Sequence, residues 1–206
     1  MAIKNVVFDF GQVLVWFDPI YMVNKYVEDK DDRALLSEVV FDRLYWDRLD
    51  LGTISDEETM ACVLKRLPRR LWDVAETIYY NWIYNIPEVD GMRELIKYIK
   101  EKYGVHVYLL SNISKYFSSH KDEIPILKEV EKCIFSSSIG IVKPDRRIFE
   151  HLCKECNILP EESVFVDDNK LNIIGAMNFG MGGFHFGGDV EALKSFLDEI
   201  LSSKGE

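Results

Sequence analysis

The sequence predicts an α/β fold, in which a parallel sheet carries helices on both faces and a helical segment is inserted after the first strand. Two observations lead to this prediction. From residue 87 onward, short apolar runs alternate with amphipathic stretches, an order typical of a parallel sheet covered by helices. Between residues 17 and 86, apolar residues recur at helical spacings, so this stretch interrupts the alternation just after the first strand.

The composition is that of an ordinary globular protein with an excess of acidic residues. The chain has 206 residues, of which 48% are hydrophobic and 29% charged, a length that allows one or two domains. The net charge of −10 argues against nucleic acid or an anionic membrane as a partner. No apolar run reaches the ~20 residues of a membrane span, and an early Asp9 is unlike a signal peptide. We expect a cytoplasmic protein, either a monomer or a homodimer.

The first half of the chain predicts one strand followed by helices. Residues 3–8 form a short run rich in β-branched residues, which indicates a buried strand. Further on, Ser55 and Glu58 have the spacing of a capping box, and Pro68 should end the helix that they open. Aromatic packing within this stretch is also expected, since it holds or adjoins every tryptophan of the chain: Trp16, Trp46, Trp72 and Trp82.

The second half predicts alternating helices and strands. Gly104 and Gly180 follow amphipathic stretches as C-terminal caps, and Pro144 is suited to a first helical turn. The helices are expected at residues 89–103, 144–157, 171–179 and 190–201. The strands are expected at residues 105–110, 133–137, 163–166 and 184–186.

Three of the predicted strands end at polar side chains. Asp9 follows the first strand, Ser111 and Asn112 follow the second, and Asp167 and Asp168 follow the strand at residues 163–166. In open parallel sheets, ligands bind beyond the carboxyl ends of the strands. We therefore expect these residues to meet at one edge, although a single aspartate at a strand end often only starts a loop.

Carboxylates gathered in this way repel one another unless a positive charge lies among them. One candidate is Mg²⁺, which takes one or two carboxylates together with water and phosphate oxygens. The other is Lys143, which Pro144 biases toward an extended backbone just before a predicted helix. A solvated surface lysine is the alternative interpretation of Lys143.

The cysteines carry a weaker signal. Cys153 and Cys156 have the C-x-x-C spacing of some redox and zinc sites, but a zinc site would want a second pair. Positions three apart are neighbours on a helix. We therefore favour two half-buried thiols on one helix face, with no role assigned.

Four short segments resemble, in order, the motifs of the haloacid-dehalogenase-like hydrolase superfamily. They are Asp9-Phe10-Gly11, Leu110-Ser111-Asn112, Lys143-Pro144-Asp145 and Asp167-Asp168-Asn169. The resemblance implies a Rossmann-like core at residues 1–16 and 87–206, with a mobile helical cap at 17–86. Glycine in the first motif is similar to a subgroup that includes bacterial sugar-phosphate phosphatases.

The resemblance implies a Mg²⁺-dependent phosphatase that hydrolyses a small phosphorylated metabolite, such as a sugar phosphate. Asp9 would be the nucleophile and would form an aspartyl-phosphate intermediate. Ser111 and the backbone of Asn112 would hold the phosphoryl oxygens, and Lys143 would neutralise the nucleophile and the transferring group. Physical chemistry agrees, because a carboxylate that attacks a phosphate dianion needs positive charge beside it.

The same resemblance implies the metal ligands. Asp168 would bind Mg²⁺ directly together with Asp9, with Asp167 in support. Most phosphatases of the superfamily carry an aspartate two residues after the nucleophile, and its backbone carbonyl also contacts the metal. Here that residue is Gly11, which can supply the carbonyl but not the acid.

The missing acid leaves three explanations open. The leaving group could depart unassisted, as an anomeric or acyl phosphate would. Another residue could serve as the acid, and Asp18, at the entry to the cap, is the nearest candidate, although it also suits an N-cap ahead of Pro19. The protein could also be a weak or inactive enzyme, since general acid help is typically worth roughly 10²–10⁴-fold in rate.

Substrate choice is expected to lie in the cap. Trp16, Trp46, Asp47 and Arg48 are candidates, because an aromatic ring and a guanidinium can stack on and hydrogen-bond to a sugar or an acid group. Packing within the cap and a solvated Arg48 are the alternative. Two other functions also stay open, namely hydrolytic dehalogenation of a small 2-haloacid, which needs no proton for the leaving halide, and non-catalytic binding of a phosphometabolite.

Overall fold

Five parallel strands form the centre of the computed structural model, which describes residues 2–202. Their spatial order is β3-β2-β1-β4-β5, so the first strand is central. Phe8 at the end of β1 lies opposite Leu109 and Val166, which brings the carboxyl ends of three strands to the same level. The strands are β1 (Asn5–Phe8), β2 (His106–Ser111), β3 (Lys132–Phe135), β4 (Ser163–Asp167) and β5 (Gly182–His185).

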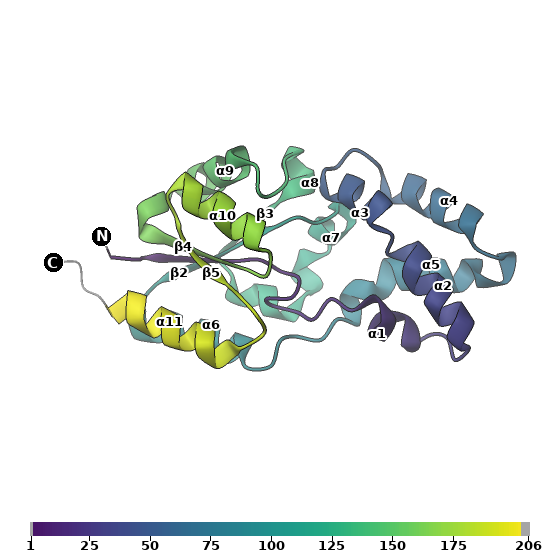
Figure 1. Cartoon of the computed structure of the whole chain (residues 1–206), viewed down its shortest axis with the longest axis horizontal. Coiled ribbons are helices and arrows are strands. Elements are labelled where there is room, and N and C mark those ends of the chain that lie inside the picture. The colour runs from purple at the N-terminus through teal and green to yellow at the C-terminus, as the bar shows by residue number, and fades with distance from the viewer. Residues whose placement is uncertain (1, 203–206) are drawn as a thin grey trace.

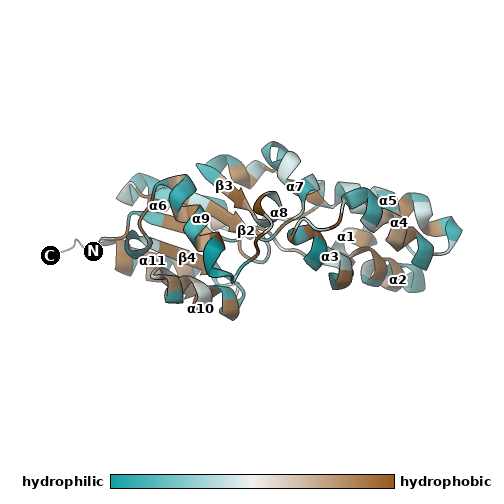
Figure 2. Cartoon of the chain, turned by 90° about the horizontal axis from the view of Figure 1, so that it is seen from above, coloured by the Kyte–Doolittle hydropathy of each residue, from teal (hydrophilic) through white to brown (hydrophobic). Residues whose placement is uncertain are grey.

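Helices cover both faces of this sheet (Figure 1). The covering helices are α6 (Met92–Tyr103) and α11 (Val190–Ser202) on one face, and α9 (Arg146–Cys156) and α10 (Lys170–Phe179) on the other. Successive strand residues point to opposite faces. Accordingly Val6 and Phe8 pack in the cluster that contains α6 and α11, whereas Val7 packs with α9 and α10. Figure 2 shows the strands as hydrophobic ribbons between helices of mixed polarity. The predicted α/β fold class is confirmed.

The stretch between β1 and β2 contains a group of helices that lies beyond the carboxyl edge of the sheet (Figure 1). They are α1 (Pro19–Asn24), α2 (Lys30–Val40), α3 (Arg43–Asp50), α4 (Asp56–Arg66) and α5 (Trp72–Asn81), with 3-10 turns at Arg69–Leu71 and Trp82–Tyr84. The capping box is present, since Ser55 and Glu58 each accept the other's backbone N–H. The helix that it opens ends at Arg66, two residues before Pro68. We call α1–α5 the cap.

The chain enters and leaves the cap along two neighbouring segments. The Trp16 backbone N–H donates to the Pro87 carbonyl at 2.8 Å, and the Val89 N–H donates to the Leu14 carbonyl at 3.0 Å. The division into a core at 1–16 and 87–206 and a cap at 17–86 remains a prediction, and the two crossings lie at its boundaries.

Several predicted boundaries shift by a few residues. The helix predicted from Pro144 begins at Arg146, because the Asp145 side chain accepts the Arg147 N–H and caps it. The strand predicted to reach residue 137 ends at Phe135, and the next residues turn into α8 (Ser136–Ile139). The remaining short elements are α7 (Lys115–Ser119) and 3-10 turns at Lys121–Glu123, Pro125–Glu129 and Pro160–Glu162.

Both cysteines of the C-x-x-C pair lie on α9 as free, half-buried thiols, and burial raises the pKa of each to about 11. This agrees with two neighbouring thiols on a helix face. Within residues 2–202, none of the helices combines the length and the apolar character needed to cross a bilayer.

Candidate active site

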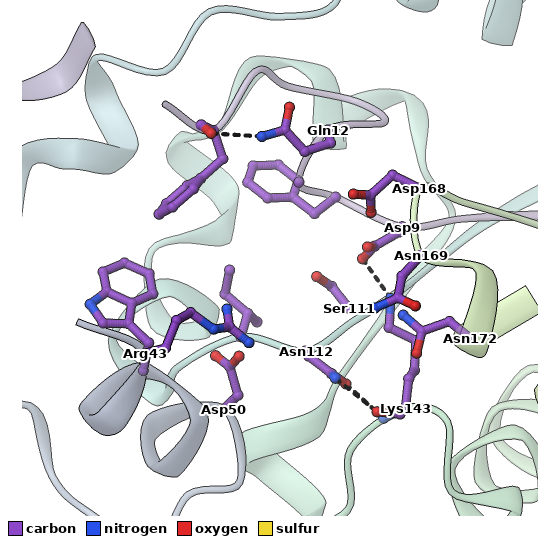
Figure 3. A pocket seen from close by; sticks show the side chains of 15 residues that line it. Asp9, Gln12, Arg43, Asp50, Ser111, Asn112, Lys143, Asp168, Asn169 and Asn172 are labelled. Carbon is purple, nitrogen blue, oxygen red and sulfur yellow. Dashed lines mark hydrogen bonds and ion pairs between the residues drawn. The ribbon is translucent and has the colours of Figure 1, made fainter. Parts of the chain in front are cut away.

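A cavity of about 390 Å³ opens between the carboxyl edge of the sheet and the cap (Figure 3). Asp9, Ser111, Lys143 and Asp168 all line it, so the structure brings together three side chains that the sequence placed at separate strand ends and the lysine that it placed in a loop. Its other lining residues are Phe10, Gly11, Gln12, Asn112, Ile113, Asn169 and Asn172 from the core, and Phe17, Arg43, Trp46 and Asp50 from the cap side.

Lys143 is buried between two carboxylates. Its Nζ lies 2.7 Å from Asp9 Oδ1 and 2.7 Å from Asp167 Oδ2, and only 1% of its side chain is exposed. Burial by itself would lower the pKa of Lys143, but the two carboxylates raise it above its ordinary value. The ammonium group therefore stays charged at the floor of the cavity, and Lys143 is not a surface lysine.

Asn112 fixes the backbone that carries this lysine. Its Oδ1 accepts the Lys143 N–H at 2.8 Å, and its Nδ2 donates to the Lys143 carbonyl at 3.2 Å. One donor and the oxygen of the side-chain amide are thereby engaged, so the amide holds the Lys143 backbone in place.

Asp167 is held almost entirely by the protein. Besides Lys143, its carboxylate accepts the Asn169 backbone N–H at 2.8 Å and the Asn172 side-chain amide at 3.0 and 3.1 Å. It is fully buried and does not line the cavity. These contacts suit a residue that positions Lys143 better than one that binds a ligand directly.

Asp9 and Asp168 present the accessible carboxylates. Burial raises the pKa of Asp9 to about 6, with Asp167 adding to the rise and Lys143 opposing it. Burial and Asp167 also raise the pKa of Asp168. One oxygen from each of Asp9, Asp167 and Asp168 lies within 4.8 Å of the others. The buried Asp9 Oδ1 contacts Lys143 Nζ at 2.7 Å. Three carboxylate oxygens this close together fit a hard cation such as Mg²⁺.

Ser111 ends β2 beside Asp9 and is 98% buried, with 2% of its surface exposed at the cavity. Within residues 2–202, its hydroxyl makes no hydrogen bond. A free hydroxyl at this position can donate to an oxyanion in the cavity.

Gly11 has room for a side chain. A Cβ built there would meet only the Phe17 Cβ, at 3.9 Å, which is ordinary contact distance. The site therefore lacks an acid here because residue 11 is glycine, and not because neighbouring atoms leave no space for a Cβ.

Three candidates from the sequence do not lie where we expected. Asp18 is exposed and caps α1, where its Oδ1 accepts the N–H groups of Ile20 and Tyr21. It does not line the cavity, so the N-cap interpretation describes its contacts. Trp16 is 37% exposed and packs against Gly188. Arg48 is exposed, because it points away from the face of α3 that carries Trp46.

Trp46 does line the cavity, and its face of α3 carries residues that sequence reasoning missed. Arg43, Trp46 and Asp50 are spaced three and four apart, so they share one side of the helix. The indole N–H of Trp46 donates to the Val40 carbonyl at 2.9 Å, so the ring meets the cavity without a free donor. Helical spacing from Trp46 was the signal that could have found Arg43 and Asp50.

A parallel sheet whose strand-end carboxylates share a cavity with a buried lysine, closed by a helical insert, defines the class of capped α/β hydrolases. The model of the haloacid dehalogenase-like hydrolase family matches residues 3–180, and the chain belongs to this family. The family resemblance seen in the motifs is confirmed, and the protein is a hydrolase.

Known proteins similar to this chain include two phosphatases. A D-ribitol-5-phosphate phosphatase of Bacteroides thetaiotaomicron is 29% identical over 182 residues, covering 83% of this chain and 85% of that protein. A sesquiterpene phosphatase of Aspergillus oryzae is 27% identical over 183 residues, covering 88% of this chain and 89% of that protein. Among solved structures, an enzyme of the same family from Bacteroides thetaiotaomicron, in complex with magnesium and inorganic phosphate, has a TM-score of 0.67 at 20% identity. That match covers 93% of this chain and 99% of the other, and it indicates a shared fold.

Proposed function

We propose that the protein is a Mg²⁺-dependent phosphatase that hydrolyses a small phosphorylated metabolite through an aspartyl-phosphate intermediate. The observation that carries this proposal is the position of Asp9, whose carboxylate faces the cavity with Lys143 Nζ at 2.7 Å. The two relatives named as phosphatases support the reaction class.

The cation would be held by Asp9 and Asp168, with the backbone carbonyl of Gly11 as a further ligand and Asp167 in support. These donors are all oxygens, as Mg²⁺ prefers. When bound, the ion supplies positive charge that offsets the repulsion between the attacking carboxylate and the phosphate dianion.

The protein side chains then have distinct tasks. Asp9 attacks phosphorus, and the bond from phosphorus to the leaving oxygen breaks. Lys143 stays protonated and stabilises negative charge on the transferring group. The Ser111 hydroxyl and the Asn112 backbone N–H donate to the phosphoryl oxygens. Water then attacks phosphorus, which frees Asp9 and releases inorganic phosphate.

Substrate preference follows from the cap side of the cavity. Phe17 and Trp46 offer aromatic surface, and Arg43 lies at the mouth with most of its side chain exposed. These groups suit a small organic phosphate with apolar or hydroxylated carbons, and a sugar or polyol phosphate fits this description.

The test is hydrolysis of p-nitrophenyl phosphate with Mg²⁺ and with EDTA. Its leaving group departs readily, so the assay does not depend on a general acid. We expect turnover that EDTA abolishes and that Asp9→Asn abolishes as well. Asp18→Asn is the matched control, because asparagine also caps a helix, and it should leave the rate unchanged.

Three outcomes would reject the proposal. Full activity of Asp9→Asn would exclude this carboxylate as the nucleophile. Halide release from 2-chloropropionate without Mg²⁺, together with no phosphate release, would favour a dehalogenase. Binding of phosphate with no turnover of either compound would favour a non-catalytic binding protein.

A further inference from the structure

We propose that Asp50, at the end of cap helix α3, is the proton donor to the leaving group and the base that activates water, the two tasks that Gly11 cannot perform. This inference rests on the proposed phosphatase function. It assigns to a residue of the cap the role of the missing acid, for which the sequence offered Asp18 only as the nearest candidate.

Three of the described residues that line the cavity carry a carboxyl group, namely Asp9, Asp50 and Asp168. Asp9 is the proposed nucleophile, and Asp168 is the proposed metal ligand. Asp50 has neither task, and it faces the cavity from the cap, across from Asp9 (Figure 3). A general acid must reach the leaving oxygen, which lies on the side of phosphorus opposite the nucleophile, so the cap side is the required one.

The Asp50 carboxyl group is buried, with the Arg43 guanidinium as a neighbouring charge (Figure 3) but without a direct hydrogen-bond or ion-pair partner among residues 2–202. Only 8% of the residue is exposed. Buried carboxyl groups in proteins are nearly always paired. An exception that opens into a cavity is suited to exchange its proton with a ligand.

The backbone holds Asp50 at this position. Its carbonyl accepts the hydroxyl of Ser136 on α8 at 2.5 Å, and the same Ser136 oxygen accepts the Ile113 N–H at 3.0 Å. Two residues further on, Gly52 lies so close to the core that a Cβ there would be 2.7 Å from the Ser137 carbonyl oxygen. The cap is therefore tied to the core at Asp50, close to the strand end that carries Ser111.

Burial and the surrounding charges allow the Asp50 carboxyl group to hold a proton near neutral pH. Burial raises the pKa of Asp50 to about 7; Arg43 opposes the rise, Asp47 and Asp9 add to it, and Lys143 opposes it. The helix packed against Asp50 from the core, α8, carries no charged side chain. A general acid works best when its pKa lies near the operating pH.

The proton balance closes over both half-reactions. While the Asp9–phosphorus bond forms and the bond to the leaving oxygen breaks, Asp50 gives its proton to that oxygen, and the alcohol departs. In the second half, the Asp50 carboxylate takes a proton from the attacking water as the new oxygen–phosphorus bond forms. Asp9 leaves as a carboxylate, phosphate is released, and Asp50 is protonated again.

The test compares substrates whose leaving groups differ in their need for a proton. Asp50→Asn keeps the shape of the side chain and removes the acid. We expect it to slow phenyl phosphate by roughly 10²–10⁴-fold, the usual worth of general acid–base help, and p-nitrophenyl phosphate far less. The kcat of the unchanged protein for phenyl phosphate should fall as the pH rises through about 7, and Asp50→Asn should lack this fall.

A second variant separates proton transfer from structural damage. Adding Gly11→Asp to Asp50→Asn places an acid where the first motif of the family carries one, and the Cβ of the new side chain would meet Phe17 Cβ only at an ordinary 3.9 Å. Recovery of phenyl phosphate hydrolysis is expected. Asp56→Asn is the matched control, since Asp56 is also a cap aspartate with a raised pKa but bonds to Tyr79 away from the cavity.

Equal slowing of both phosphates by Asp50→Asn, or a raised KM with unchanged kcat, would overturn the inference, because either result describes a positioning or binding role. The failure of the proposed function looks different. In that case the unchanged protein would hydrolyse neither phosphate in the presence of Mg²⁺.

Discussion

Lys143 is the residue in which folding and chemistry are most closely linked. Removing an ammonium group from water costs several kcal/mol, and its two carboxylate contacts at 2.7 Å offset that cost. The same contacts hold two buried carboxylates near each other, which would otherwise repel. Lys143 and Asp9, the two charged groups on which the proposed reaction depends, thus also contribute to the packing of the protein interior.

Lys143→Met tests this link. The substitution leaves Asp9 and Asp167 without their shared cation, so we expect a loss of about 3–5 kcal/mol in the free energy of unfolding. Hydrolysis of p-nitrophenyl phosphate should fall by at least roughly 10²-fold, as when one oxyanion donor is removed. Urea unfolding and initial rates measure the two effects.

Lys132→Met is the control for Lys143→Met. Lys132 pairs with Glu155 at 3.0 Å on the surface, with 43% of its side chain exposed, and should contribute less than about 1 kcal/mol. Equal unfolding midpoints for the two variants would show that the buried lysine carries no structural role.

Asp50 offers a prediction about stability that is independent of catalysis. Its pKa is about 7 in the folded protein and 3.8 as an ordinary aspartate, so the folded state binds the proton more tightly. Between these two pH values the unfolded chain ionises first, and the stability of the protein falls as the pH rises. Asp50→Asn does not ionise, so its stability relative to the unchanged protein should increase from pH 4 to pH 8 by up to about 4 kcal/mol. Unfolding curves at the two pH values measure the change, and a difference that stays constant with pH would contradict the placement of an ionisable Asp50 in a buried site.

At the scale of elements, the loop between α3 and α4 sets how the cap meets the core. Gly52 has a φ of +71°, and a Cβ there would lie 2.7 Å from the Ser137 carbonyl oxygen, a backbone atom that cannot rotate away. Gly52→Ala should therefore push the loop off α8 and displace Asp50. We expect it to lower both the melting temperature and kcat/KM.

Gly104→Ala is the control that measures only the cost of placing alanine at a positive φ, without a close contact of the new Cβ. Gly104 ends α6 with a φ of +66°, but no atom lies within 4 Å of a Cβ built there. The cost should be only the left-handed conformation, roughly 1–2 kcal/mol, with activity unchanged. If both variants lose the same stability and keep the same kcat/KM, close contact at Gly52 does not control the site.

The elements also show what the sequence could and could not predict. Asp9, Ser111 and Asp168 were predicted to meet because a strand end is a local feature and parallel pairing brings such ends together, and all three line the cavity. Lys143 was predicted from its loop and also lines the cavity. Arg43 and Asp50 were not predicted, because the face of α3 that meets the cavity depends on how the helix is rotated over the sheet, and helical spacing identifies them only once Trp46 is placed at the cavity. The same rotation makes Trp46 a lining residue and turns Arg48 to solvent.

At the scale of the whole molecule, the cap and one face of the sheet share a single buried apolar cluster. It contains Val6 and Phe8 of β1 as well as Val40 and Ile78 of the cap. Ring contacts cross the boundary, since Trp82 stacks on Phe117 of α7 with centroids 5.6 Å apart. The cap is a continuous segment of the chain, but it does not have a hydrophobic core of its own, because its buried apolar residues, among those that the structure describes, belong to the same cluster as those of the sheet.

This continuity predicts that cap and core unfold together. The tryptophans report on the cap and its entry, because all four lie between residues 16 and 82, whereas far-ultraviolet circular dichroism reports on all helices and strands. For a two-state transition the two probes must coincide. We expect one urea midpoint by both, because Trp46 and Trp82 belong to the same buried apolar cluster as Phe8 of the sheet. If the tryptophan signal changes at a lower urea concentration than the dichroism, the cap opens as a separate unit, and the shared cluster does not couple it to the sheet.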